Sequence, residues 1–192
     1  MQVQPRLLDH PFYVAWMKGE VSQKTLAAYH RSYAEFIQRI PSYWQTVVKA
    51  FQPHLTHTSS VVQEELHHID LWEKWGKRFT PPDDFPRMQS VLDLLDGMTP
   101  SQLLGAIHAF EVQQPEVART KKEGLLRHYG FRHEELRYFD EHENEECHLA
   151  YGRWLAGCFA NPAEFNAFRS CRLSNLKKVN PSGIRNNRAF LH

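Results

Sequence analysis

The chain has 192 residues and a mass of 22.6 kDa, which is the size of one large domain. Hydrophobic residues make up 42% of it and charged residues 23%, and 23 basic side chains against 22 acidic ones leave a net charge of +1. This composition excludes a disordered tail and a fibrous repeat, and it lacks the basic excess that binding to nucleic-acid phosphates requires. We therefore expect a globular protein without a nucleic-acid partner.

Membrane and secretion signals are also missing from the sequence. The longest apolar stretch, residues 154–160, is too short to cross a bilayer. The N-terminus lacks the apolar segment of a secretory signal. Three cysteines (Cys147, Cys158 and Cys171) form no CxxC pair, and an odd number argues against a disulfide framework. These features predict a cytoplasmic protein with no membrane partner.

Apolar residues recur with helical spacing almost throughout the chain. The pattern predicts seven helices, at about residues 11–18, 23–40 continued as 42–51, 59–79, 89–95, 99–129, 133–159 and 163–179. Pro41 should kink or break the second helix and Pro115 should bend the fifth, because proline lacks the N–H that a helix interior needs. We expect an all-α fold: one seven-helix bundle over residues 1–179, followed by a polar tail over residues 180–192.

The helix predicted at residues 59–79 carries a carboxylate on its apolar face. At 100° per residue, Glu65 lies in the middle of the hydrophobic stripe and His68 flanks it, about 60° away. Glu64 and His67 lie about 100° or more from Glu65, so we expect them to reach water. A carboxylate on an apolar face costs several kcal/mol unless it is paired or bound to a metal.

Two later helices repeat this arrangement. Glu111 lies on the apolar stripe of the helix predicted at residues 99–129. In the helix at residues 133–159, Glu141 lies within about 20° of His148, and Glu145 lies within about 60°. His142 is about 120° from His148, so an unbroken helix cannot direct both imidazoles at one centre.

These residues form two Glu-x-x-His pairs and two further inward carboxylates. Helical bundles that hold two iron or manganese ions use such pairs, because carboxylates offset the charge of the cations and imidazole suits iron. The predicted metal ligands are Glu65, His68, Glu111, Glu141, Glu145 and His148. The alternative is a core network in which buried acids and histidines satisfy each other by hydrogen bonds, without a metal.

The chain resembles a known family over about residues 7–157. The resemblance rests on the segments His10-Pro-Phe-Tyr-Val-Ala-Trp16, Lys18-Gly-Glu20, His68-Ile-Asp-Leu-Trp72, Phe110-Glu111, Pro115-Glu-Val-Ala-Arg leading to Lys121 and Gly124, Tyr138-Phe-Asp-Glu-His142, and His148. Together these are similar to the haem-oxygenase-like di-iron oxidases, the family that contains the Chlamydia protein associating with death domains. More distantly the chain is similar to the PqqC and TenA proteins of the same fold.

The resemblance implies a seven-helix haem-oxygenase-like bundle that forms a homodimer and binds two iron ions, or iron and manganese, in place of haem. The family's ligands would correspond to Glu65 or Glu64, His68 and Glu111, followed by a His-x3-Asp-x2-His motif. At those last three positions this chain has Glu141, Glu145 and His148. Aligned instead through Tyr-Phe-x-x-His, the family's first histidine would be His142.

The resemblance also implies a reaction. Members use dioxygen to oxidise a small amine- or carboxylate-bearing metabolite, and the chlamydial branch makes p-aminobenzoate from its own tyrosine with a lysine as nitrogen donor. Tyr13 and Lys121 match these two positions as catalytic residues. Helical periodicity alone places Lys122, not Lys121, in phase with Glu111. The hypothesis is a non-haem di-iron oxidase; its alternatives are a metal-free PqqC- or TenA-like enzyme and a non-catalytic helical interaction protein.

Overall fold

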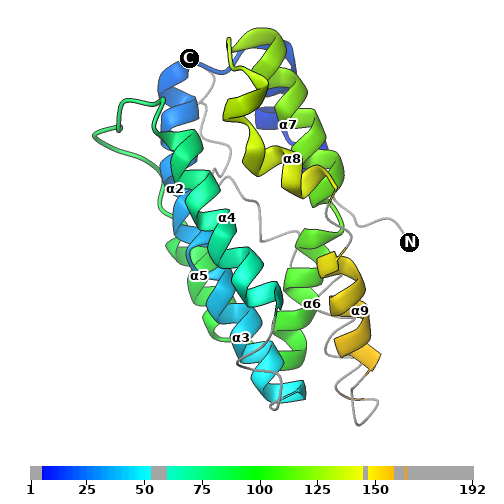
Figure 1. Ribbon diagram of the computed structural model, residues 1–192. Coiled ribbons are helices and arrows are strands. Elements are labelled where there is room, and N and C mark those ends of the chain that lie inside the picture. Colours follow the sequence, from blue (N-terminus) through cyan, green and yellow to red (C-terminus); the bar gives the residue numbers. More distant parts are fainter. Residues whose placement is uncertain (1–5, 53–59, 145–146, 158–162, 164–192) are drawn as a thin grey trace.

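The computed structural model describes residues 6–52, 60–144, 147–157 and 163 (Figure 1). Over these residues the regular structure is helical and contains no strand, which confirms the all-α prediction. The helices are η1 Leu7–Asp9, α1 Pro11–Lys18, α2 Gln23–Ile37, α3 Ile40–Phe51, α4 Ser60–Gly76, α5 Gln89–Asp96, α6 Pro100–Glu111, α7 Gln114–His128, η3 His133–Glu135, α8 Arg137–Glu143 and α9 Cys147–Gly157. Most of the predicted helix 163–179 and the whole tail 180–192 lie outside the described residues.

The helix ends follow from local side-chain chemistry. The Ser22 hydroxyl accepts a hydrogen bond from the Thr25 amide at the start of α2. Thr99 and Gln102 form a reciprocal capping box at the start of α6. Gly19 ends α1 with φ at 73°, a left-handed conformation that glycine adopts without steric cost.

Two prolines mark short breaks between successive helices. Pro41 is the second residue of α3 and Pro115 is the second residue of α7, so each break precedes its proline. A proline in the first turn loses no helical hydrogen bond, whereas one in the interior would remove a bond and clash with the preceding turn. The prediction of one helix over residues 99–129 is therefore wrong in its continuity: α6 and α7 are two helices, joined by Val112 and Gln113, whose backbone angles stay right-handed helical.

The predicted helix at residues 133–159 is also divided. A short 3₁₀ turn, η3, precedes α8, which ends at Glu143, and α9 begins at Cys147. The cap residue Asn144 has φ −109° and ψ 8°, outside the helical region. The prediction of one uninterrupted helix over residues 133–159 is therefore wrong. Because His142 and His148 lie on different helices, the angle of 120° between them no longer applies.

The breaks fall at one level of the molecule. In Figure 1, α7 continues above α6 and α8 lies above α9, while α4 runs alongside both levels. Helix α4 packs against α2, α3 and α8, and α9 packs against α6. The end of α6 and the start of α9 consequently lie opposite the middle of α4, which is where the predicted ligands occur.

Close packing between α1 and α7 positions a second group of side chains. A Cβ atom at Gly124 would lie 2.6 Å from Cδ1 of Trp16, so only glycine permits this approach. The indole N–H of Trp16 donates to the Lys121 carbonyl at 3.1 Å, which fixes α1 against α7. Tyr13, one turn before Trp16, is thereby held in the core beside α7. Among the described helices, none has the length and apolar character of a membrane span.

Candidate metal centre and lysine cage

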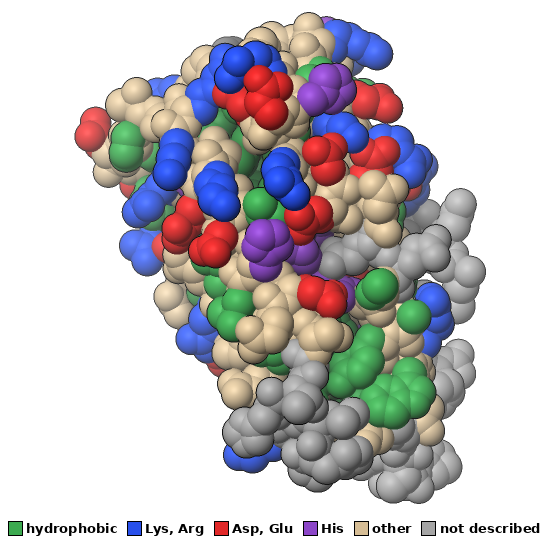
Figure 2. Space-filling model, in the orientation of Figure 1, with side chains coloured by type: hydrophobic (Ala, Val, Ile, Leu, Met, Phe, Trp, Pro, Cys, Tyr) green, Lys and Arg blue, Asp and Glu red, His purple; other side chains and the backbone are tan. Residues whose placement is uncertain are grey.

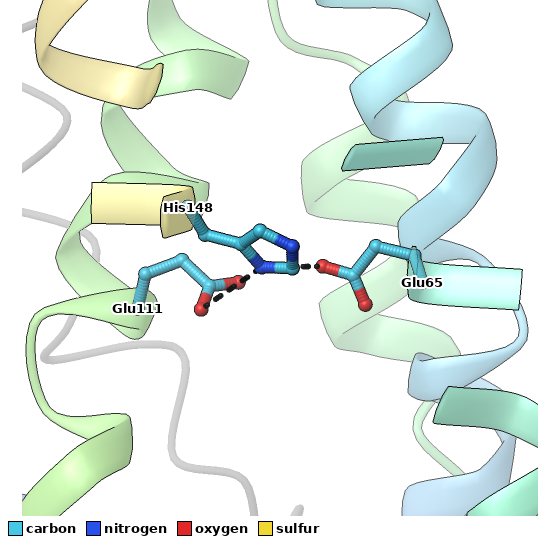
Figure 3. A group of neighbouring side chains, drawn as sticks. All are labelled: Glu65, Glu111 and His148. Carbon is cyan, nitrogen blue, oxygen red and sulfur yellow. Dashed lines mark ion pairs between the residues drawn. The ribbon is translucent and has the colours of Figure 1, made fainter. Parts of the chain in front are cut away.

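Three buried side chains converge between α4, α6 and α9 (Figure 3). His148 Nδ1 lies 3.3 Å from Glu65 Oε1 and 3.9 Å from Glu111 Oε2. One ligand atom from each residue falls within 4.8 Å of the other two. All three residues were predicted to point inward, and each is at most 5% exposed. We call them the carboxylate–histidine group.

The hydrogen bonds of this group favour a bound cation. His148 Nε2 lies 3.0 Å from Glu64 Oε2, and since a carboxylate accepts, the imidazole donates its proton there. A neutral His148 would then direct the lone pair of Nδ1 at the oxygens of Glu65 and Glu111. Two buried carboxylates facing a lone pair need a positive charge between them, from a second imidazole proton or from a metal. Carboxylate oxygens with imidazole nitrogen are the donor set of non-haem iron and manganese, so the residues fit such an ion.

Neighbouring side chains support the same centre. Trp44 Nε1 donates to Glu65 Oε1 at 3.1 Å, which orients this carboxylate. His68 Nδ1 lies 3.3 Å from Glu65 Oε2, and the His68 ring centroid is 5.8 Å from that of His148. The Glu64 side chain is 44% exposed, so it reaches water as expected, and its Oε2 also contacts His148. Glu64 and Glu65, the two glutamates between which the sequence did not decide, therefore both contact the His148 imidazole.

The choice between Glu141 and His142 depends on the division between α8 and α9. His142 is buried, and its ring centroid lies 4.2 Å from that of His68. Its Nδ1 donates to the Tyr138 carbonyl at 2.7 Å, which leaves the lone pair on Nε2, the nitrogen that a metal would bind. The Glu141 side chain is 33% exposed, with Oε2 3.7 Å from His68 Nε2. Glu145 lies outside the described residues.

The Lys121 side chain lies in a separate aromatic enclosure, which we call the lysine cage. Its Nζ is 5.2 Å from the ring centroid of Tyr13, 5.1 Å from that of Tyr29 and 5.2 Å from that of Tyr33. Nζ donates to Tyr29 Oη at 2.6 Å, and the lysine is 4% exposed. Burial lowers the pKa of Lys121 to about 7.

The phenols of the cage stay protonated. Burial raises the pKa of Tyr13, and burial followed by the neighbouring phenols raises that of Tyr29. Burial, followed by the neighbouring phenols Tyr138 and Tyr13, raises the pKa of Tyr33. The Tyr33 ring centroid lies 6.3 Å from that of Phe110, the residue before Glu111, so the cage adjoins the carboxylate–histidine group. Sequence reasoning missed Tyr29 and Tyr33, although their i, i+4 spacing puts them on one face of α2.

Lys121, not Lys122, enters the core. The α6–α7 break resets the helical phase, so α7 buries Lys121. Lys122 instead pairs with Asp140 at 2.8 Å and Glu143 at 2.7 Å. The resemblance to the family thus selected the buried lysine, Lys121, whereas helical periodicity counted from Glu111 selected the wrong one, Lys122.

Comparisons with known proteins give a consistent name for the relatives. No family model matches the chain. The chain is 29% identical to the 4-aminobenzoate synthase of Chlamydia trachomatis serovar D, over 73% of this chain and 68% of that protein. It is 27% identical to the protein of that name from Chlamydia muridarum (73% and 67%) and 25% identical to the one from Nitrosomonas europaea (77% and 71%). The chain is an enzyme.

Proposed function

We propose that the protein forms 4-aminobenzoate from its own side chains, with Tyr13 as the source of the ring and Lys121 as the source of nitrogen. The observation that carries this proposal is the lysine cage, in which Nζ of Lys121 lies against the ring of Tyr13 in a closed apolar space. The 4-aminobenzoate synthases to which the chain is similar support the identity of the product.

The atoms of the two side chains account for the product. The Cα–Cβ bond of Tyr13 breaks, and Cβ is oxidised to the carboxyl carbon. The phenolic oxygen leaves as water and is replaced by Nζ of Lys121, whose bond to Cε breaks to leave an aldehyde at Cε, while Cα of residue 13 takes up hydrogen to become glycine. Two molecules of dioxygen are the oxidant, with two electrons from an added reductant and two protons, and two molecules of water are formed in all. Because the chain loses the Tyr13 side chain and the ε-nitrogen of Lys121, each molecule makes one product.

The cage prepares the lysine for this role. With a pKa of about 7, Lys121 is partly unprotonated at neutral pH and offers an amine lone pair. Tyr29 Oη accepts a hydrogen bond from Nζ, which fixes the amine among the rings. The closed space excludes water, which would otherwise compete for reactive species.

The metal ligands in this proposal are Glu65, His68, Glu111, Glu145, His148 and, in preference to Glu141, His142. Burial beside His68 and a lone pair directed by the Tyr138 carbonyl support His142. Two iron ions, or iron and manganese, would supply activation of dioxygen when bound. The homodimer implied by the resemblance stays a prediction.

Isotope labelling tests the proposal. The chain is produced with ring-labelled tyrosine and ε-¹⁵N lysine, reconstituted with ferrous ion with and without manganese, reduced and exposed to air. We expect 4-aminobenzoate with both labels in the mass spectrum, and a matching mass loss in the chain.

Matched variants assign the labels to positions. Tyr13→Phe and Lys121→Arg should abolish the product. Tyr43→Phe and Lys122→Arg, which alter a tyrosine and a lysine outside the cage, should retain it. Unlabelled product from an added metabolite would show an external substrate instead, and product that persists after metal chelation would favour a metal-free enzyme.

A further inference from the structure

A cleft of about 600 Å³ lies between α4 and the η3–α8 segment. Its walls include basic side chains from both sides (Lys74, Lys77, Arg78 and Arg137) and the aromatic side chains Trp75 and Tyr138. Figure 2 shows Lys and Arg side chains on this face, interspersed with Asp and Glu side chains and next to histidine side chains. We call it the basic cleft.

The charges of the basic cleft do not cancel internally. Arg78 donates to both oxygens of Glu135, at 3.1 and 2.9 Å, and Glu134 pairs with Arg132 at 3.0 Å. Lys74 and Lys77 have no carboxylate within 4.0 Å among the described residues. The cleft therefore presents two exposed ammonium groups to a ligand, which favours an anion.

The inner wall of the basic cleft is aromatic. Trp75 is buried in the core, and within the described part of the chain its indole N–H has no hydrogen-bond acceptor. Together, the aromatic wall and the ammonium groups fit a small flat molecule that carries a carboxylate.

Tyr138 connects the basic cleft to the candidate metal centre. Its ring centroid lies 4.2 Å from that of His142 and 6.3 Å from that of His68. The same side chain lines the cleft, so one aromatic ring separates the cleft from these histidines.

We propose that the basic cleft binds a small aromatic carboxylate and is the route by which 4-aminobenzoate leaves the protein. This inference rests on the proposed function for the identity of the ligand. Lys74 and Lys77 attract the carboxylate, Trp75 contacts the ring, and Tyr138 is the gate.

Calorimetric titration of the full chain with 4-aminobenzoate at low ionic strength tests the binding site. The Lys74→Gln, Lys77→Gln double variant should weaken binding by about fivefold, the loss expected for two exposed ion pairs. Lys18→Gln with Lys49→Gln, two exposed lysines on α1 and α3, is the matched control and should change binding by less than about twofold. The uncharged 4-aminobenzamide should bind equally to all three proteins.

The outcomes separate this inference from the proposed function. If 4-aminobenzoate binds the double variant and the wild type with equal affinity, the cleft is not its binding site. If inorganic phosphate binds the wild type as tightly as 4-aminobenzoate does, the cleft is not a site for an aromatic carboxylate. Labelled product from the wild type would still support the proposed function in either case. Conversely, cleft-dependent binding without labelled product would keep the carboxylate site and reject the self-derived product.

Discussion

The carboxylate–histidine group and the lysine cage lie side by side in the core but handle buried charge in opposite ways. In the first, the ionisable side chains come from α4, α6 and α9 and contact one another. In the second, one amine from α7 is surrounded by phenols that remain neutral. The first keeps its charges and needs a cation, whereas the second lowers the charge by releasing a proton.

This difference separates the two tasks that the proposed reaction requires. A group of acids that a cation must neutralise is suited to holding metal. A desolvated amine with a lowered pKa is suited to forming a bond to carbon. Substitutions in the carboxylate–histidine group should therefore change metal affinity, whereas substitutions in the lysine cage should change the ionisation of the amine.

The largest expected effect comes from removing the charge of the cage. Lys121→Met should raise the free energy of unfolding by about 4 kcal/mol at pH 7, because the wild type must bury an ammonium or release its proton. Between the folded pKa of about 7 and the unfolded value of 10.5, the unfolded chain binds more protons, so wild-type stability rises with pH. The advantage of the variant should therefore shrink towards pH 10.

Urea unfolding at pH 6.5, 8 and 9.5 measures this trend. Lys122→Met is the control: hydrogen bonds to Asp140 and Glu143 raise the pKa of Lys122, so its replacement should lower stability by a similar amount at all three pH values. A stability gain for Lys121→Met that is independent of pH would contradict a desolvated amine in the cage.

The second effect concerns the metal centre and decides between neighbouring residues. We expect His142→Gln to weaken ferrous-ion binding by about 100-fold, because a buried imidazole beside His68 is lost. Glu141→Gln should weaken it by less than about tenfold, because this side chain is one-third exposed. Competition with a chromophoric chelator measures both affinities, and the reverse order would restore Glu141 as the ligand.

The smallest effect concerns the packing that holds the cage together. Gly124→Ala should destabilise the fold by about 1–3 kcal/mol, because its Cβ would overlap Trp16 and push α1 from α7. Gly97→Ala, where an added Cβ meets only ordinary contacts, should change stability by less than about 0.5 kcal/mol. Thermal unfolding of the two variants checks this pair, and equal shifts would argue against close contact at Gly124.

Much of the fold and part of the site follow from local sequence rules. The apolar periodicity predicts the all-α architecture, and Ser22 and Thr99 begin their helices as capping residues should. Glu65 lies on a continuous helix, so its inward orientation could be computed from its neighbours. Where a helix runs without interruption, the rotation of 100° per residue is sufficient.

Where a helix is broken, that calculation fails. Lys121 follows the α6–α7 break, and His142 and His148 are separated by the division between α8 and α9. At each of these places the side chain's direction depends on how the second helix packs, which no count of residues supplies. The resemblance of Lys121 to a known position carried information that periodicity lacked.

The sequence by itself determined the helical architecture, the inward direction of Glu65 and the capped helix starts after Ser22 and Thr99, because these depend on neighbours within one or two turns. The tertiary structure alone decided that Glu64 contacts His148, that His142 approaches His68 and that Tyr13, Tyr29 and Tyr33 enclose Lys121. Those contacts join helices distant in sequence, and their geometry is set by packing across the breaks rather than by rotation along a single helix.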